Sequence, residues 1–263
     1  MNGKNLRMRR IMDATTGRTV IVPMDHGVSL GPVEGIATIN DSIRRVSDGG
    51  ATCIVVHKGI AGQLNQKIMG NLGLIVHLSA STSLWNEPNR KILVGDALDA
   101  VRLGADAVSI HVNLGGKYET EMMEQMGKVS SQCIELGMPL LAMMYPRGKN
   151  IKKDNDVDQV KLATRVAAEL GADIVKTVYT GDPESFREVT RGCPVPVVVA
   201  GGSKTDDRTT LELIEGAMAG GAAGISIGRN AFQHRTPDKF VRAAACIVHQ
   251  NKSVEEALKV LNG

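Results

Sequence analysis

Aromatic residues are scarce in this chain of 263 residues, where Phe, Trp and Tyr together make up only 3%. Since 43% of the residues are hydrophobic, the core has to be built mainly from Val, Ile, Leu, Ala and Met. Nucleic-acid sites rely on basic surfaces with aromatic side chains that stack on bases. The net charge of +3 and the short cluster Arg7-Met8-Arg9-Arg10 provide neither. We therefore expect no nucleic-acid partner, and a solvated helix or a phosphate-binding rim at this cluster.

Paired cysteines and long apolar runs are also missing. The four cysteines are far apart and form no C-x-x-C motif; they are Cys53, Cys133, Cys193 and Cys246. No apolar run reaches the roughly 18 residues that a membrane-spanning helix needs. Residues 1–18 lack the apolar stretch of a signal peptide. Together these features predict reduced thiols in a cytoplasmic protein without a membrane partner.

One local pattern recurs five times along the chain. A helix-like segment ends in glycine, and a short apolar segment follows at once. The glycine-containing junctions lie at residues 48–51, 103–106, 136–139, 170–173 and 219–222. Glycine supplies the left-handed conformation at which many helices end. The repetition predicts alternating helices and strands, and hence a parallel sheet.

Eight segments are candidate strands, and most are continuously apolar, as expected when both faces of a sheet are covered. They are Val20–Met24, Cys53–Val56, Leu74–Leu78, Val108–His111, Leu140–Met144, Ile174–Thr177, Val195–Ala200 and Gly224–Ile227. Eight such units in about 250 residues are typical of a (β/α)8 barrel, known as a TIM barrel. An open doubly wound sheet is the alternative, but it usually carries G-x-G-x-x-G after its first strand, and the chain has no such motif.

The chain shows no change of composition that would mark a domain boundary. We therefore expect a single α/β barrel domain over residues 1–263 with a short N-terminal extension. The charged loop 149–158 falls between the fifth strand and its helix, and should be exposed. Ser253 and Glu256 have the spacing of a capping box, which predicts a final helix.

Titratable and polar residues gather where the predicted strands end. Barrel enzymes place their catalytic groups at these carboxyl ends. The residues at the ends of the first six strands are Asp25, His26, His57, Lys58, His77, His111, Tyr145, Arg147 and Lys176. The opposite ends, where helices lead into strands, consist mostly of Gly and Ala. The pattern predicts a functional site at one rim of the barrel.

Lys176 ends an apolar strand, where a cation is costly to bury unless its pKa is lowered. A lysine amine with a lowered pKa is a nucleophile that can form a Schiff base with a carbonyl substrate. The alternative is a strand-end lysine whose ammonium lies in solvent. Lys58 is a rival nucleophile, but His57 before it and Gly59 after it indicate a wetter position, so we favour Lys176.

The last two strands end in glycines. Gly201-Gly202 follows the seventh strand, and Gly228-Arg229 follows the eighth. Glycines let backbone N–H groups approach an anion closely, a short helix near Asn230 would add its positive end, and a phosphate site at this place recurs among barrels. Ordinary turns are the alternative, with the Arg229 side chain facing outward. We favour a phosphate site.

A phosphate site beside a nucleophilic lysine indicates a sugar-phosphate ketone as substrate, and such a reaction needs a group that moves protons. Tyr145, on the strand next to Lys176, can donate or accept a proton. Asp25 is the best carboxylate candidate. The alternatives are that Tyr145 is a rim hydrogen bonder and that Asp25 is a structural partner of Lys58 or Lys176.

Four histidines near the strand ends raise the possibility of a divalent-metal site, because imidazole is a common metal ligand. They are His26, His57, His77 and His111. No His-x-His pair or carboxylate cluster completes a ligand set, so we favour binding of substrate hydroxyl groups and expect no metal and no cofactor.

Five segments together resemble the archaeal-type class I aldolase family, in order and over nearly the whole chain: residues 22–29, 143–148, 173–177, 199–202 and 228–233. The resemblance implies that Lys176 is the Schiff-base lysine, Tyr145 the proton donor and Asp25 the proton acceptor. The implied substrate-binding residues are Asp25, His26, Gly27, Val28, Ser29, Tyr145, Pro146, Arg147 and Lys176, with Gly201, Gly202, Gly228 and Arg229 at the phosphate. The family also implies no metal and a ring-shaped homo-oligomer, often a decamer.

Within this family the chain is most similar to synthases that carry out a transaldol transfer on a route to 3-dehydroquinate and aromatic amino acids. The resemblance implies that Lys176 captures 1-deoxy-D-threo-hexo-2,5-diulose 6-phosphate, that hydroxypyruvaldehyde phosphate leaves, and that the retained enamine attacks L-aspartate 4-semialdehyde. The alternative is fructose-1,6-bisphosphate aldolase. Met143 occupies a position where those aldolases tend to have a bulky aromatic residue, which favours the synthase.

A function of another class is a non-catalytic barrel that binds a phosphosugar, because a fold does not determine a function. The presence of Asp25, Tyr145 and Lys176 together argues against it.

Overall fold

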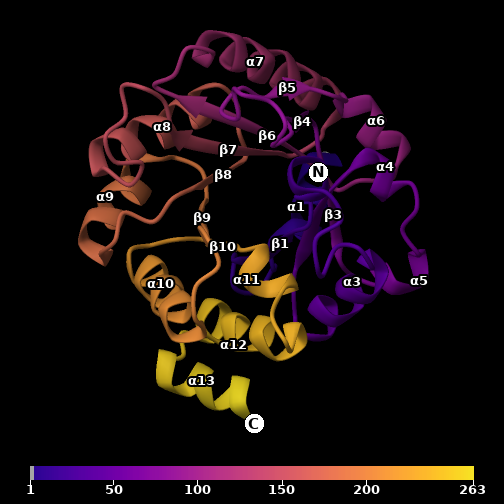
Figure 1. Ribbon diagram of the computed structural model, residues 1–263, viewed down its shortest axis with the longest axis vertical. Helices are drawn as coiled ribbons and strands as arrows, with labels where there is room; N and C mark the ends of the chain where they lie inside the picture. Colours follow the sequence, from indigo (N-terminus) through magenta and orange to yellow (C-terminus); the bar gives the residue numbers. More distant parts are fainter. Residues whose placement is uncertain (1–2) are drawn as a thin grey trace.

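The computed structural model describes residues 3–263. Eight parallel strands close into a barrel inside a ring of helices (Figure 1), which confirms the predicted (β/α)8 fold and all eight predicted strands. The strands are β1 (Thr19–Pro23), β2 (Cys53–His57), β3 (Gly73–His77), β6 (Ala107–Leu114), β7 (Leu140–Pro146), β8 (Ile174–Thr177), β9 (Val197–Ala200) and β10 (Gly224–Ser226). Each barrel strand pairs with the one before it, and β10 pairs with β1.

The helices that follow the strands surround the barrel, and the short helix directly after β10 lies at its mouth (Figure 1). They are α3 (Ile39–Asp48), α4 (Lys58–Ala61), α5 (Gln66–Met69), α6 (Ala97–Arg102), α7 (Glu119–Leu136), α8 (Val157–Glu169), α9 (Pro183–Gly192), α10 (Asp207–Ala219), α11 (Arg229–Phe232), α12 (Pro237–Gln250) and α13 (Val254–Asn262). Several begin where an aspartate or serine side chain accepts a hydrogen bond from a first-turn N–H. The predicted capping box of Ser253 and Glu256 is confirmed at α13. No helix within residues 3–263 is long and apolar enough to cross a membrane.

The predicted glycine junctions have the backbone conformation that the pattern requires. Each contains one glycine in the left-handed region, with φ between 58° and 94°: Gly50, Gly104, Gly137, Gly171 and Gly221. A side chain is strained in this conformation, which explains why glycine stands where each chain segment turns from a helix into the next strand.

The barrel interior is filled by every second residue of each strand. Ile21, Val55, Ile75, Leu141 and Ile174 belong to one buried cluster inside the barrel. Their neighbours along each strand belong to the larger cluster between the sheet and the helices. This alternation follows from the two-residue period of a strand. The side chains beyond this apolar layer, toward the carboxyl ends, therefore also face inward.

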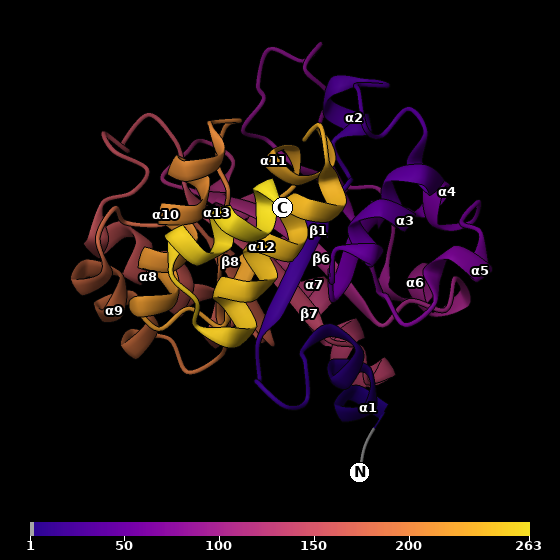
Figure 2. The same cartoon turned by 90° about the horizontal axis from the view of Figure 1, so that it is seen from below.

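The N-terminal helix α1 (Gly3–Ile11) lies at the amino ends of the strands, below the barrel in Figure 2. Ile11 and Met12 are buried in the inner cluster and close this end. Arg10 Nε lies 2.7 Å from Asp106 Oδ1, and the Arg7 guanidinium donates to the Gly137 carbonyl. The basic cluster is therefore part of a helix, as the first alternative had it. The second alternative, a phosphate-binding rim, is wrong, because α1 lies at the end of the barrel opposite the carboxyl ends of the strands.

Two repeats of Leu-Gly-Ala-Asp anchor this end of the barrel. Asp106 Oδ2 accepts a hydrogen bond of 2.9 Å from the N–H of Leu74, at the start of the preceding strand. Asp173 Oδ2 accepts one of 2.8 Å from the N–H of Leu140, and it also pairs with Lys4 at 2.9 Å. Each aspartate thus joins two strands and a basic residue of α1.

The carboxyl ends carry small elements that the sequence pattern did not predict. Helix α2 (Gly27–Leu30) follows β1, and a hairpin of β4 (Ser79–Ala80) and β5 (Ile92–Leu93) follows β3. Elements this short have no periodicity to detect. Both elements lie above the barrel mouth and form part of the wall around it.

We predict that Asp106→Ala lowers the free energy of unfolding by about 2 kcal/mol, because it leaves the Leu74 N–H without its acceptor and Arg10 without its carboxylate. Urea denaturation measures the change. Asp158→Ala is the control: its side chain is 90% exposed, and we expect a change below about 0.5 kcal/mol. Equal losses in the two variants would contradict the anchoring role of Asp106.

Candidate functional site

A polar cavity of about 380 Å³ opens at the carboxyl ends of the strands. Asp25, Tyr145 and Lys176 line it together, although they come from three different strands or strand ends. Both glycine turns, after β9 and β10, lie on its wall. The structure thus brings together the three residues that the sequence singled out for chemistry.

Lys176 faces the cavity from β8. It lies two residues after the inward-facing Ile174, and its backbone pairs in register with Met143 of β7. Only 8% of Lys176 is exposed. Burial lowers the pKa of its amine to about 8, although Asp25 raises this pKa and Arg147 lowers it further. A neutral, nucleophilic fraction is therefore available close to physiological pH.

Asp25 follows β1 and lies among histidines. Its carboxylate oxygens are 3.6 Å from His26 Nδ1 and 3.8 Å from His77 Nε2. Burial by itself would raise the pKa of Asp25, but interactions with His77, His26 and Lys176 outweigh it and lower the pKa to about 2. The carboxyl group is therefore ionised and can accept a proton or hold a cation.

Tyr145 lies on β7, two residues beyond Met143, so it shares the inward face of that strand. Its ring centroid is 5.0 Å from that of His111, and the Arg147 guanidinium carbon lies 4.4 Å from the Tyr145 centroid. Burial raises the pKa of the phenol above its usual range. The hydroxyl group is therefore protonated and available as a donor in the cavity.

The two glycine turns are tightly built. A Cβ atom at Gly228 would come within 2.6 Å of the His26 ring, and Gly202 has φ of 66°. Arg229 lines the cavity, and its guanidinium donates to the Gly202 carbonyl at 3.0 Å. Asn230 reaches back to the Gly201 carbonyl at 3.2 Å. These contacts connect both turns, and Arg229 does not face outward.

The histidines divide into two groups. His26 and His111 line the cavity, whereas His77 is buried beneath it and bonds to Ser109 Oγ at 2.8 Å. The His57 ring packs 5.2 Å from that of His77. Burial lowers the pKa of all four imidazoles, that of His77 to about 4, so they are neutral near pH 7. Within residues 3–263, no group of three His, Cys, Asp or Glu residues has the arrangement of a metal site.

Three expected residues lie elsewhere than the sequence indicated, whereas Lys58 has the position expected for it. Strand β6 continues to Leu114, so His111 is not at its end. Lys58 begins α4, is about half exposed and pairs with Asp99 at 2.9 Å, away from the cavity. Gly27 and Pro146 are not on the cavity wall as the structure describes it.

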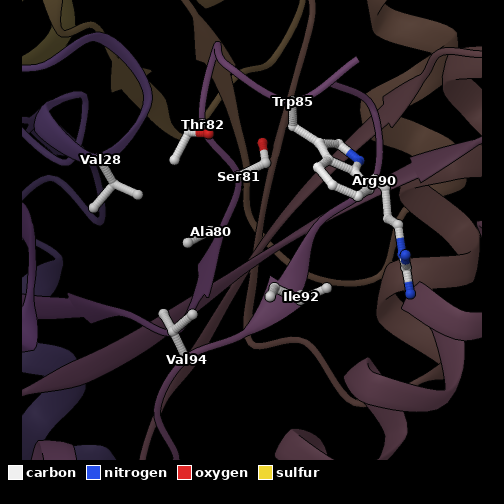
Figure 3. Close-up of a pocket in the computed structure, with 8 residues that line it drawn as sticks. All are labelled: Val28, Ala80, Ser81, Thr82, Trp85, Arg90, Ile92 and Val94. Carbon is white, nitrogen blue, oxygen red and sulfur yellow. The ribbon is translucent and has the colours of Figure 1, made fainter. Parts of the chain in front are cut away.

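Val28 lines a separate apolar hollow beside the polar cavity (Figure 3). Side chains of α2 and of the β4–β5 hairpin face one another across it, among them Ala80 and Ile92. A hydrogen bond of 3.0 Å from Ser29 Oγ to the Ser81 carbonyl joins α2 to the hairpin. Of the predicted segment 25–29, Asp25, His26 and Ser29 thus reach the polar cavity, and Val28 does not.

Three polar residues of the cavity escaped the sequence analysis: Lys91, Asp154 and Ser226. Ser226 is 1% exposed, and its hydroxyl has no hydrogen-bond partner within the described chain. It lies two residues before Gly228, so the alternation of β10 places it on the inward face. Lys91 and Asp154 come from the hairpin and from the loop after β7, where no periodic pattern points to a cavity.

The arrangement supports a specific chemistry. A buried amine with a lowered pKa can add to a ketone, and a phenol and a carboxylate in the same cavity can move protons. The glycine turns and Arg229 offer N–H groups and positive charge to an anion.

Comparison with known proteins gives a consistent result. Residues 19–234 match the model of the DeoC/LacD family aldolases. The chain is 46% identical to 2-amino-3,7-dideoxy-D-threo-hept-6-ulosonate synthase 1 of Archaeoglobus fulgidus, over 98% of this chain and 96% of that protein. It is 41% identical to the 2-amino-3,7-dideoxy-D-threo-hept-6-ulosonate synthase of Halobacterium salinarum, over 97% and 95% of the two chains.

Among solved structures, an archaeal fructose-1,6-bisphosphate aldolase, with its catalytic Lys covalently bound to the carbinolamine intermediate, superimposes with a TM-score of 0.85 at 32% identity. The match covers 94% of this chain and all of that one. The predicted aldolase family is therefore confirmed.

We predict that Asp25→Asn lowers the pKa of Lys176, because the Asp25 carboxylate raises it. Only the neutral amine is acylated, so labelling of Lys176 should rise with pH around 8 in the unmodified protein and at lower pH in the variant. Acetic anhydride labelling followed by peptide mass spectrometry measures the profile.

The matched control for this experiment is Asp99→Asn, which removes a carboxylate outside the cavity. It should leave the Lys176 profile unchanged. An Asp25→Asn profile that stays in place or moves to higher pH would contradict the proposed electrostatic coupling.

Proposed function

The chain belongs to the DeoC/LacD family of aldolases, and on this premise we propose that it is a 2-amino-3,7-dideoxy-D-threo-hept-6-ulosonate synthase. This enzyme would be a transferase of the transaldolase type, acting in a route to 3-dehydroquinate and aromatic amino acids. Its substrates would be 1-deoxy-D-threo-hexo-2,5-diulose 6-phosphate and L-aspartate 4-semialdehyde. The observation that carries the proposal is Lys176, a buried amine with a lowered pKa that shares one cavity with Asp25 and Tyr145.

In the proposed mechanism, Lys176 attacks the C2 ketone of the donor and loses water to form an iminium ion. The iminium withdraws electrons while the C3–C4 bond breaks, so the step requires neither a metal nor an organic cofactor. Hydroxypyruvaldehyde phosphate leaves, and C1–C3 remain on Lys176 as an enamine. The enamine carbon then attacks the aldehyde of L-aspartate 4-semialdehyde, and water hydrolyses the new iminium to free the product and the lysine.

Two groups would transfer the protons. Asp25 is ionised, which suits a base that accepts the proton of the donor C4 hydroxyl during cleavage. Tyr145 is protonated because burial raises the pKa of its phenol, which suits a donor to the new hydroxyl after the addition. The proton that Asp25 took up would then pass to the Tyr145 phenolate, which restores both groups for the next turnover. The neutral histidines His26 and His111 would hold substrate hydroxyl groups, since each lines the cavity. Ser226, buried and without a partner in the described chain, would do the same.

The phosphate of the donor would bind at the two glycine turns. Gly201, Gly202 and Gly228 line the cavity without side chains, so an anion could approach their backbone N–H groups, and Arg229 would supply positive charge. This use of the loops after the last two strands is common in barrels. A side chain at Gly228 is excluded in any case, because a Cβ atom there would collide with the His26 ring.

The alternative function is class I fructose-1,6-bisphosphate aldolase. Both reactions begin with a ketose phosphate on a lysine, so the shared residues do not separate them. The synthases from Archaeoglobus fulgidus and Halobacterium salinarum are 46% and 41% identical, whereas the solved aldolase is 32% identical. Met143, buried opposite Lys176, also favours the synthase, because the aldolases tend to have a bulky aromatic residue at its position.

We further propose that residues 1–263 act as one catalytic domain in a cytoplasmic, ring-shaped homo-oligomer such as a decamer. The family resemblance supports the oligomer, and the four buried, unpaired cysteines are compatible with a reducing compartment. Size determination by light scattering would test the assembly. The partners proposed for the site are the two small-molecule substrates alone.

Borohydride should trap the ketose phosphate on Lys176, because reduction makes the Schiff base permanent. We expect one adduct that peptide mapping locates at Lys176, and none in Lys176→Met. Lys58→Met is the matched control and should still form it, since Lys58 points away from the cavity. An adduct on Lys58 would refute the assignment of Lys176, and the absence of any adduct would refute the Schiff-base mechanism.

The choice of substrate can be tested on the unmodified enzyme. We expect condensation of the donor with L-aspartate 4-semialdehyde, with kcat/KM roughly 100-fold above that for cleavage of fructose 1,6-bisphosphate, since a site that pairs the polar groups of one substrate rejects another by such factors. Mass spectrometry of the product and a coupled triose-phosphate assay measure the two reactions. Preferred cleavage of the bisphosphate would support the aldolase instead.

A further inference from the structure

The cavity has positive side chains on both sides of Lys176. Strand β8, which carries Lys176, lies between β7 and β9 in the barrel. Arg229 lies with the glycine turns on the side of β9 and β10, whereas Arg147 follows β7 and Lys91 lies close enough to His111 of β6 to lower its pKa. The two glycine turns and Arg229 are already assigned to one anion, the phosphate of the donor. Lys91 has no role in the function proposed so far, and Arg147 has only the general substrate-binding role that the family resemblance implies.

Lys91 is held in a defined place. Its ammonium donates a hydrogen bond to the hydroxyl of Ser81, across the β4–β5 hairpin. The preceding residue, Arg90, forms an ion pair of 3.0 Å with a glutamate of α7. Asn113 of β6 donates a hydrogen bond of 2.8 Å to the Asn89 carbonyl. The hairpin segment whose apolar side is seen in Figure 3 is thus attached to β6 and to α7 through the two residues that precede its lysine.

The two cations face the cavity without a carboxylate partner. Within residues 3–263, neither Lys91 nor Arg147 forms an ion pair. The guanidinium of Arg147 instead lies over the Tyr145 ring. Burial lowers the pKa of Lys91 and the charge of Arg147 lowers it further, although the Asp25 carboxylate raises it. Two like charges in one cavity destabilise each other, and an anion bound between them would reverse that effect.

The same cavity also has two carboxylates in its lining. Asp154 belongs to the exposed loop between β7 and α8. The other carboxylate, Asp25, lies deeper, beside His26 and His77. A ligand with one negative and one positive group would therefore find a partner for each within this cavity, the negative group at Lys91 and Arg147 and the positive group at Asp154.

We propose that Lys91, Arg147 and Asp154 form a subsite for the amino-acid end of the aldehyde substrate. The α-carboxylate of L-aspartate 4-semialdehyde binds between Lys91 and Arg147, and its α-ammonium group binds to Asp154. The aldehyde carbon, at the other end of this short molecule, then points toward the enamine on Lys176. The inference rests on the proposed function and adds to it a separate binding place for the second substrate.

Steady-state kinetics of Lys91→Met with both substrates test the subsite. We expect KM for L-aspartate 4-semialdehyde to rise roughly 10- to 100-fold, as for the loss of one charge-assisted hydrogen bond, with KM for the ketose phosphate changed less than about twofold. Borohydride trapping of the ketose phosphate on Lys176 should be unchanged. Lys91→Arg keeps the charge and should recover most of the loss, and Lys128→Met, on the exposed face of α7, is the matched control.

Altered aldehydes supply the second half of the experiment. Succinate semialdehyde lacks the ammonium group, so the unmodified enzyme should prefer L-aspartate 4-semialdehyde by roughly tenfold, and Asp154→Asn should remove that preference. Butanal lacks both charged groups, and Lys91→Met should use it as well as the unmodified enzyme does. This comparison separates the loss of a binding contact from general damage to the cavity.

The outcomes distinguish this inference from the function on which it rests. If the unmodified enzyme condenses L-aspartate 4-semialdehyde but Lys91→Met leaves its KM unchanged, or raises the KM for the ketose phosphate equally, the subsite is refuted and the synthase function stands. If the unmodified enzyme traps the ketose phosphate but does not use L-aspartate 4-semialdehyde at all, both the proposed function and the subsite are refuted.

Discussion

The charge of Asp25 is the interaction on which the rest of the cavity depends. Its carboxylate lies within 4 Å of two imidazoles and interacts with the amine of Lys176. Burial disfavours every charge in this region, and it is the main reason why the pKa of Lys176 is lowered. Asp25 partly offsets the effect of burial on the pKa of Lys176. The pKa therefore stays in a range where the amine can act as a nucleophile and can also be protonated during the reaction.

The geometry that brings these groups together follows from closing a parallel sheet into a barrel. Every second residue of each strand faces inward, so the apolar layer formed by Ile21 and Ile174 is followed, toward the carboxyl ends, by Asp25 and Lys176. Helix α1 fills the opposite end with Ile11 and Met12. The cavity therefore has one open end, above an apolar floor that excludes water from the lysine.

Much of this arrangement can be predicted from the sequence because it is periodic. The glycine junctions locate the strands, and the strand ends locate Asp25 and Lys176. The same reasoning expected a wetter position for Lys58, between His57 and Gly59, and the structure agrees, but the sequence did not identify the partner of its side chain. In the structure, Asp99 of α6 draws the Lys58 side chain outward.

What the sequence did not reveal depends on contacts between distant segments. Lys91 enters the cavity because the hairpin is attached to α7 and β6, through side chains that are remote in sequence. Asp154 belongs to an irregular loop. Ser226 could have been found by counting alternate positions back from Gly228, but only once the register of β10 was known.

The proposed phosphate site and the proposed carboxylate subsite would give the cavity two regions for anions, and the order of the reaction offers a reason for their separation. In the proposed transfer, the aldehyde fragment that leaves carries the phosphate, and the aldehyde that replaces it carries a carboxylate. If both anions used the glycine turns, the leaving fragment would compete with the incoming aldehyde for Gly202 and Arg229. With the carboxylate bound at Lys91 and Arg147 instead, on the other side of Lys176, the second aldehyde can take its place as soon as the first has left. The enamine would then be exposed to water for a shorter time.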